Sequence, residues 1–240
     1  MAVKTYSLKK DGEKRLQPNF RVREFASQDG ADEILIDLTL VEYLQKLRDC
    51  LQLSSLEIVS GYRTPERNKA VGGAKVSQHL EGKAADVCAY KDGKNLHPKY
   101  LCCAAEVLGM TGIALIQTCA HLDTRPYRSW FDENYNNARI QSFGHESWFT
   151  YCKVKKLDFM LNPFKKPTDT LKKGMSGEVV KWLQFELIKR GFLTLISANG
   201  KCNIDGAFGA NTERAVKAFQ DTMNLEVDGK FGKLSMAAMK

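Results

Sequence analysis

Apolar residues recur at helix and strand spacings through the first 160 residues of the chain. Leucines from Leu40 to Leu51 fall on one helix face, opposite charged residues, which predicts a helix over residues 34–53. A second helix is predicted over residues 95–110, with Pro98 in its first turn. Shorter apolar runs predict strands, at residues 56–64, 84–90 and 113–123.

The pattern changes beyond this region. Two prolines in the stretch FMLNPFKKPTDT predict a linker at residues 161–169. Amphipathic helices are predicted in GEVVKWLQFELIKRG and NTERAVKAFQDTM, and the turn sequence DGxFG occurs at residues 205–209 and again at 228–232. The chain is therefore predicted to be α+β over residues 1–160, with a small antiparallel sheet and flanking helices. A small all-α three-helix domain is predicted over residues 170–240.

Positive charge is concentrated at the C-terminal end. The whole chain of 240 residues carries a net charge of +8, and residues 165–240 hold 13 Lys/Arg against 8 Asp/Glu. This excess predicts an anionic partner, either nucleic acid or an anionic cell wall. No basic helix carries interleaved base-reading residues, which argues against nucleic acid.

The N-terminal stretch MAVKTYSLKKDGEKR is charged and has no apolar segment behind it. We therefore expect no secretory signal peptide, synthesis in the cytoplasm, and another route of exit for any work outside the membrane. A membrane span is not expected, because no run of about 18 apolar residues is present.

The seven cysteines are odd in number and include no CxxC pair. Most lie in apolar stretches such as YLCCAAEVLGM, which predicts buried, reduced thiols rather than a disulfide framework. A cysteine-ligated zinc site is not expected either, because such sites use CxxC-type pairs.

A histidine and an aspartate lie seven residues apart in the stretch SQHLEGKAADV, at His79 and Asp86. Gly82 between them lets the chain reverse, and Asp86 then falls within an apolar strand. A buried carboxylate is costly unless it is paired or binds a metal ion. Spacing alone leaves two interpretations: a pair of metal ligands, or a solvated histidine beside an aspartate that caps a turn.

A hydrolytic zinc site needs three protein ligands and an open position, and His121 is the best candidate for the third. Among the other histidines, His97 precedes a proline at a helix start, which indicates a capping or surface residue, and His145 lies in a polar loop. His121 ends an apolar strand and precedes Asp123 by two residues. Strand alternation predicts two shared faces, one with Cys119, His121 and Asp123, the other with Asp86 and Cys88.

The stretches SGYRTPERNKAVGGA, SQHLEGKAAD and HLDTR resemble the zinc D-alanyl-D-alanine carboxypeptidase-type peptidases, relatives of the lysostaphin and hedgehog metal-site fold. The resemblance covers residues 17–150 and implies cleavage of peptide bonds in bacterial cell-wall peptides. It implies a zinc ion held by His79, Asp86 and His121, with Arg63 binding the substrate.

The stretches LKKGMSGEVVKWLQ, DGAFGANTERAVKAFQ and VDGKFG resemble the peptidoglycan-binding three-helix module attached to many wall hydrolases. This resemblance implies peptidoglycan as the partner, and the positive charge suits an anionic envelope. We expect a monomer that acts on the wall after release, as an endolysin encoded by a phage or prophage does. An exported bacterial autolysin is the alternative.

The general base is less clearly marked. Several relatives place an acid three residues before the last ligand or a histidine two residues before it, where this chain has Thr118 and Cys119. Asp123 is therefore predicted either to serve as the base or to orient the last ligand, with His145 or Glu146 as alternatives.

Two functions from different classes follow. The first is a zinc peptidase that cuts a terminal D-alanyl-D-alanine bond, as a carboxypeptidase, or a bond within the stem or cross-link, as an endopeptidase. The second is a metal-stabilised wall-binding protein without turnover, which the absence of an upstream acid keeps open.

Overall fold

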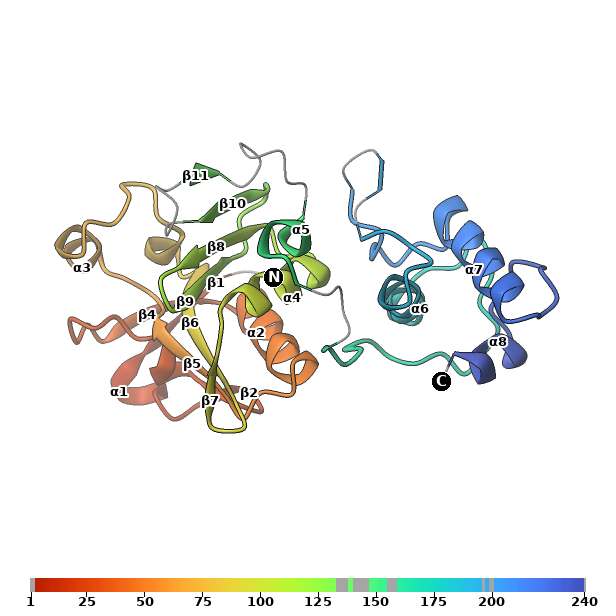
Figure 1. Cartoon of the computed structure of the whole chain (residues 1–240). Coiled ribbons are helices and arrows are strands. Elements are labelled where there is room, and N and C mark those ends of the chain that lie inside the picture. The colour runs from red at the N-terminus through yellow and green to blue at the C-terminus, as the bar shows by residue number, and fades with distance from the viewer. Residues whose placement is uncertain are drawn as a thin grey trace. The chain divides into compact units, whose positions relative to one another are not determined.

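The computed structural model describes residues 3–132, 138–139, 147–154, 159–195, 197–198 and 201–239. The chain divides into two compact units, Met1–Cys152 and Lys153–Lys240, each described by itself (Figure 1). Within the described ranges, no helix has both the length and the apolar character that a membrane span requires.

In its described residues, the first unit is built on a seven-stranded sheet in the order β11-β10-β8-β9-β6-β5, with β7 paired to the second half of β6. Neighbouring strands are antiparallel except for the parallel pair of β8 and β10. This mixed architecture confirms the predicted α+β class. The strands are β5 (Ser55–Ser60), β6 (Ala84–Lys91), β7 (Lys94–Leu96), β8 (Gly112–Ile116), β9 (Cys119–Asp123), β10 (Ser129–Asp132) and β11 (Ala138–Arg139).

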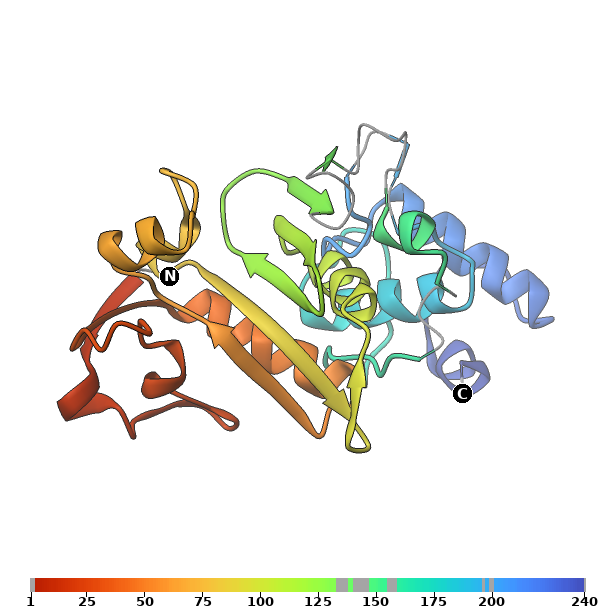
Figure 2. The ribbon, with the colours of Figure 1, turned by 60° about the vertical axis from the view of Figure 1, so that its left-hand side comes forward.

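Two helices, α2 (Leu38–Cys50) and α4 (Lys99–Leu108), pack against each other and against the sheet (Figure 2). Leucines at helical spacing on α2 are fully buried there, as the periodicity predicts. The remaining elements of this unit surround the sheet. They are β1 (Val3–Ser7), α1 (Leu8–Asp11), β2 (Arg15–Gln17), β3 (Phe20–Arg21), η1 (Val22–Phe25), β4 (Glu33–Asp37), α3 (Pro65–Ala70), η2 (Gln78–Glu81) and α5 (Trp148–Cys152).

Four predicted elements are wrong in their extent. The helix predicted over residues 95–110 starts only at Lys99, because residues 95–96 belong to β7 and Pro98 is the N-cap. The strand predicted over residues 56–64 ends at Ser60.

Residues 34–37, predicted as helix, belong to strand β4, and α2 starts only after Asp37. The side chain of Asp37 caps the helix by accepting a hydrogen bond from the N–H of Thr39 (2.9 Å). The run at residues 113–123 is a hairpin of β8 and β9 rather than one strand. The turn between them includes Gln117 at φ +38°. Because this turn contains no glycine, proline or asparagine, the sequence gives no signal that separates the two strands.

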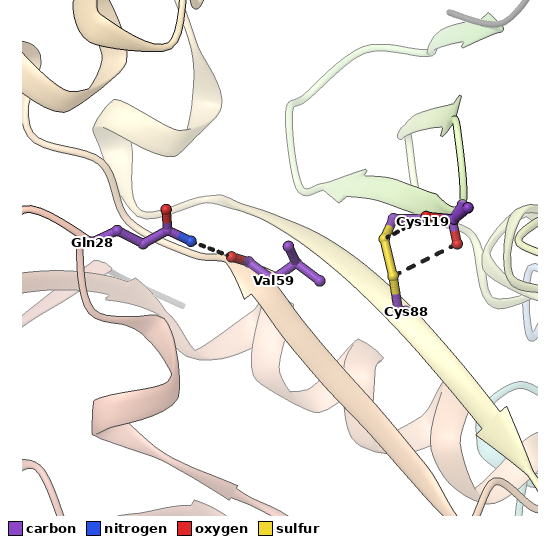
Figure 3. The surroundings of a disulfide bond; sticks show 5 residues. Gln28, Val59, Cys88 and Cys119 are labelled. Atoms are coloured by element: carbon purple, nitrogen blue, oxygen red, sulfur yellow. Dashed lines mark hydrogen bonds between the residues drawn. A yellow bond between two sulfur atoms is a disulfide. The ribbon is translucent and has the colours of Figure 1, made fainter. Parts of the chain in front are cut away.

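A disulfide joins Cys88 to Cys119, so the prediction of buried, reduced thiols is wrong for this pair (Figure 3). The reason is strand register. Pairing of Asp86 with His121 places the two cysteines directly opposite each other on β6 and β9, with Cα atoms 4.7 Å apart. Among the described residues, the other cysteines form no disulfide.

The second unit contains three helices in its described part, α6 (Glu178–Lys189), α7 (Ala210–Thr222) and α8 (Lys233–Ala238). This confirms the predicted small all-α domain. Residues 161–169, predicted as a linker, form no helix or strand. Within them, Phe164 packs edge-on against Phe185 (6.1 Å between ring centroids), and Asn162 donates to the carbonyl of Trp182.

The two DGxFG turns are each held by a glutamine from the preceding helix. Gln184 Nε2 donates to Asp205 Oδ1 (2.7 Å) and to the carbonyl of Ala207 (3.0 Å). Its Oε1 accepts the N–H of Gly206 (2.9 Å), so one side chain satisfies three groups of the turn. Gln220 makes the same bonds on the second turn, with Asp228, Lys230 and Gly229.

Candidate metal centre

The three predicted ligands converge at one point. Atoms of His79, Asp86 and His121 that can hold a metal ion all lie within 4.8 Å of one another. Nδ1 of His121 lies 2.8 Å from Asp86 Oδ1 and 3.2 Å from Nε2 of His79. The three side chains come from η2, β6 and β9, and they line a cavity of about 610 Å³ together with Arg63 and Arg125.

Sheet register brings two of the ligands together. Asp86 on β6 lies directly opposite His121 on β9, as strand alternation on the predicted shared faces requires. On the other edge of β6, the register with β5 shifts between Ile58 and Ser60 and places Ser60 opposite Asp86. The carbonyl of Val59, within the shift, accepts a hydrogen bond from Gln28 Nε2 at 2.7 Å (Figure 3).

A short 3₁₀ turn positions His79. Its start is capped by Ser77, and it ends at Gly82, whose φ of +66° suits glycine. His79 Nδ1 lies 2.6 Å from the carbonyl oxygen of Gly61, which can only accept, so Nδ1 carries the proton and Nε2 faces the other ligands. Gly61 has no room for a side chain, because a Cβ there would lie 2.7 Å from the backbone of Phe25.

His121 is oriented by Asp123. Its Nε2 lies 3.0 Å from Asp123 Oδ2, so the carboxylate accepts from Nε2 and leaves Nδ1 for a metal ion. Asp123 is fully buried and also accepts bonds from Arg125, through Nε (2.8 Å) and the backbone N–H (3.0 Å). The space for this carboxylate comes from Gly112 on β8, where a Cβ would lie 1.8 Å from Asp123 Oδ1.

Arg63 lies at the same site and binds the second oxygen of the Asp86 carboxylate. Its Nη2 is 2.5 Å from Asp86 Oδ2, and its Nε donates to Ser60 Oγ at 2.8 Å. The backbone N–H of Arg63 donates to the carbonyl of His79 (3.1 Å). The motif SGYR thus supplies a hydroxyl for the arginine, a carbonyl for His79 and the arginine itself.

Burial and hydrogen bonding compete in setting the charges of the site. Burial tends to raise the pKa of Asp86, but bonds to His121 and His79 hold it well below its usual range. Burial tends to lower the pKa of His121, yet Asp123 and Asp86 raise it to about 9. For Asp123, bonds from His121 and Arg125 outweigh burial and keep its pKa low. Without a metal ion, these shifts favour the charged form of His121, with a proton on each ring nitrogen facing a carboxylate.

These residues fit a catalytic zinc ion. Two imidazole nitrogens and one carboxylate oxygen are the ligand complement that such sites use, with one position left for water or substrate. Both imidazoles have an acceptor on the far nitrogen, Gly61 O or Asp123, which fixes the tautomer that ligation requires.

Of the residues predicted to act in catalysis, Arg63 lines the cavity, whereas Asp123 lies beneath it and is fully buried. His145 and Glu146, the alternatives for the base, lie outside the described residues. Sequence reasoning did not assign roles to Ser60, Gly61, Gly112 and Arg125. Two of them fall in the quoted motif SGYR and one in HLDTR, but their partners become visible only through the register of the sheet.

Comparison with known proteins adds to this geometry. Residues 14–123 match the family model described as Peptidase M15, and residues 176–239 match the model described as Putative peptidoglycan binding domain. The first range holds Arg63 and all three ligand candidates, and the second holds both DGxFG turns. These matches confirm both resemblances seen in the sequence.

The chain is 27% identical over 189 residues to the N-acetylmuramoyl-L-alanine amidase CwlL of Bacillus licheniformis. The match covers 74% of this chain and 50% of the relative, so the chain spans about half the length of that protein. Among solved structures, the N-terminal domain of SleB is 31% identical, over 31% of this chain and 93% of that domain, with a TM-score of 0.27.

Proposed function

We propose that this chain, in which a Peptidase M15 domain precedes a peptidoglycan-binding domain, is a zinc-dependent peptidase that cuts peptide bonds in peptidoglycan stem peptides or cross-links. The observation that carries the proposal is the convergence of His79, Asp86 and His121 in a cavity of about 610 Å³. The C-terminal unit holds the catalyst on its insoluble substrate and raises its effective concentration there.

A zinc ion bound here would lower the pKa of a water molecule to about 7 and polarise a peptide carbonyl. The chain's own residues hold and orient the reactants. Arg63 carries five N–H donors, more than its bonds to Ser60 and Asp86 use. From the cavity wall, its guanidinium can bind a substrate carboxylate or steady negative charge that develops on the scissile peptide oxygen.

Asp123 is proposed to position His121 rather than to accept the proton of the attacking water. The reason is that both of its oxygens are used inside the protein and none of its surface is exposed. Asp123→Asn separates the two roles. If Asp123 positions His121, the substitution should lower zinc affinity roughly 10–100-fold, and activity should recover at high zinc concentration. If Asp123 is the base, the substitution should leave zinc bound and abolish turnover.

The same comparison applies to His145→Ala and Glu146→Gln, where loss of turnover with full zinc content would identify the base. Glu66→Gln is a matched control, because Glu66 is an exposed acid on α3.

The test of the whole proposal is digestion of purified peptidoglycan with and without a chelator, followed by mass spectrometry of the released products. Free D-alanine indicates a carboxypeptidase, and a new amine within the stem or cross-link indicates an endopeptidase. His79→Ala should lose both bound zinc and product, whereas His97→Ala, at an exposed histidine, should keep them. Release of a peptide beginning with L-alanine would instead indicate amidase activity, the activity named for the relative CwlL.

A metal-stabilised wall-binding protein without turnover is the second candidate. It is favoured by Thr118 and Cys119, which occupy the positions where relatives carry a base. Binding to peptidoglycan without any chelator-sensitive product, across several wall types, would decide for it.

The proposed setting is lysis by a phage or prophage endolysin. Expression in a host cell should cause lysis only when the membrane is permeabilised. Wall turnover in growing cells without permeabilisation would favour an exported autolysin.

A further inference from the structure

The two repeats of the C-terminal unit differ in the length of chain between the glutamine and its turn. Asp205 follows Gln184 by 21 positions, whereas Asp228 follows Gln220 by 8. Both turns keep the same glutamine hydrogen bonds, so the longer segment of the first repeat is not needed to form the turn. The extra length calls for another explanation.

Described residues of the longer segment, 192–194, 197–198 and 203, line a cavity of about 600 Å³ together with one face of α7. Its lining includes Phe192 and Asn203 from the segment, and Asn211 and Arg214 from the start of α7. The second repeat has a cavity of only about 180 Å³. Small-ligand sites are typically about 300–1,000 Å³, so of these two cavities only the first lies in that range.

Hydrogen bonds hold the polar side chains of this cavity in place. The amide of Asn203 is buried and donates through Nδ2 to the carbonyl of Thr194 (2.8 Å). Asn211 Nδ2 donates to Asn203 Oδ1 (3.2 Å), and the guanidinium of Arg214 donates to Asn211 Oδ1. This chain of hydrogen bonds ends at Arg214, whose exposed guanidinium brings a positive charge to the cavity lining.

Apolar groups also line the cavity. The half-buried ring of Phe192 is fixed edge-on against Phe219, with 5.4 Å between ring centroids. Ala215 and Ala218 line the cavity beside it. An oriented guanidinium, a fixed amide and a fixed ring therefore surround one space. This set matches a ligand with a carboxylate, an acetamido or hydroxyl group, and an apolar ring face.

We propose that this cavity binds a muropeptide, an N-acetylated sugar that carries a short peptide with a free carboxylate. The proposal rests on the peptidoglycan partner proposed above and assigns the contacts within it. Arg214 binds the carboxylate, Asn211 bonds the acetamido or hydroxyl groups, and the sugar ring lies against Phe192.

The test is titration of the chelator-treated full-length chain with N-acetylglucosaminyl-N-acetylmuramyl-pentapeptide, followed by NMR or calorimetry. The chelator prevents the ligand from being cut. Arg214→Ala should weaken binding roughly tenfold or more, as loss of a charge-assisted bond does. Lys217→Ala, at an exposed cation on the same helix outside the cavity lining, should leave binding within about twofold of the unchanged chain, since surface substitutions away from a site have small effects.

A second comparison uses the same muropeptide with its carboxylates amidated. The unchanged chain should bind it as weakly as Arg214→Ala binds the original. Arg214→Lys keeps the charge without the planar fork and should also bind weakly. Thermal unfolding of each variant checks that the fold is retained, and Arg214 is exposed, so the fold should tolerate these changes.

The assignment would be overturned if the unchanged chain, Arg214→Ala and Lys217→Ala bound the muropeptide equally well. It would also be overturned if the unchanged chain did not bind the muropeptide, or bound the amidated form as tightly as the original. Hydrolysis of a soluble stem peptide, measured in parallel without chelator, separates this outcome from the function of the metal centre. If the chain cuts the peptide but its muropeptide binding does not depend on Arg214, only the proposed binding role of the cavity is refuted. A chain that binds through Arg214 but releases no product refutes only the peptidase.

Discussion

At the residue scale, the imidazole of His121 is held between two carboxylates, Asp86 at Nδ1 and Asp123 at Nε2. Burial opposes its charge, but the two carboxylates prevail and raise its pKa to about 9. A metal ion must take the Nδ1 position from a proton. Metal binding and protonation therefore compete at a single atom.

Zinc binding at pH 7 should release at least about one proton per chain, because His121 is protonated there without metal and neutral with it. Apparent zinc affinity should accordingly rise with pH between 6 and 9. Calorimetry in two buffers of different ionisation enthalpy measures the proton count. Equal heats in both buffers would contradict the assigned protonation of His121.

Gly112 is a second residue on which the site depends. Gly112→Ala should displace the Asp123 carboxylate, because the new Cβ would fall 1.8 Å from its Oδ1. We expect a loss of about 1–3 kcal/mol in the free energy of unfolding from overpacking, and weaker zinc binding as His121 loses its partner. Denaturant unfolding and zinc titration measure the two effects.

Gly209→Ala adds the same methyl group where nothing lies within 4 Å and serves as the control. Zinc affinity unchanged in Gly112→Ala would show that Asp123 does not set the position of His121.

At the scale of elements, the pair of β6 and β9 carries both a ligand pair and a disulfide. Asp86 faces His121, and Cys88 is bonded to Cys119 two residues along the same faces. The covalent link prevents these strands from separating or slipping in register next to the metal ligands. Stability of the strand pair and geometry of the site are therefore coupled.

Reduction of the disulfide should lower the free energy of unfolding by about 2–4 kcal/mol, given a loop of 31 residues. Thermal unfolding with and without reductant measures the shift in midpoint. A double variant, Cys88→Ser with Cys119→Ser, should unfold at the lower midpoint and ignore the reductant. Midpoints that coincide for the oxidised and reduced unchanged chain would contradict the link.

The same strand pair shows what sequence can and cannot predict. The ligands His79, Asp86 and His121 could be selected because few residue types bind zinc and only four histidines had to be weighed. The turn at Gln117 and the Cys88–Cys119 bond could not, because both depend on which strands pair and in what register. Support of the ligands by Gly61 and Gly112 likewise depends on backbone approach between segments distant in sequence.

At the scale of the whole molecule, the proposed catalytic site and the proposed wall-binding module lie in separate compact units. Residues 1–152 hold all of the proposed metal ligands and Arg63, and the second unit holds both glutamine-braced turns. Under the proposed function, binding of an insoluble wall by the second unit would confine the first to the wall surface and so raise the local substrate concentration.

A chain ending at residue 152 should therefore cut insoluble peptidoglycan roughly tenfold or more slowly than the full chain at low enzyme concentration, because it lacks the attachment. On a soluble stem peptide the two chains should differ by less than about twofold, since attachment gives no advantage there. Release of soluble product over time measures both rates. Equal rates on the insoluble wall would show that the C-terminal unit does not tether the enzyme.

The glutamine braces also have a consequence for how the proposed enzyme could be altered. The stretch between the end of α6 at Lys189 and Asp205 lies between two points that the hydrogen bonds of Gln184 to the first turn hold together. We expect this stretch to tolerate exchange of its exposed residues, because loops tied at both ends accept changes in length at small entropic cost. Under the proposed function, grafting segments from other wall-binding modules at this point should redirect the protein to other bacterial envelopes and leave the proposed metal ligands unchanged.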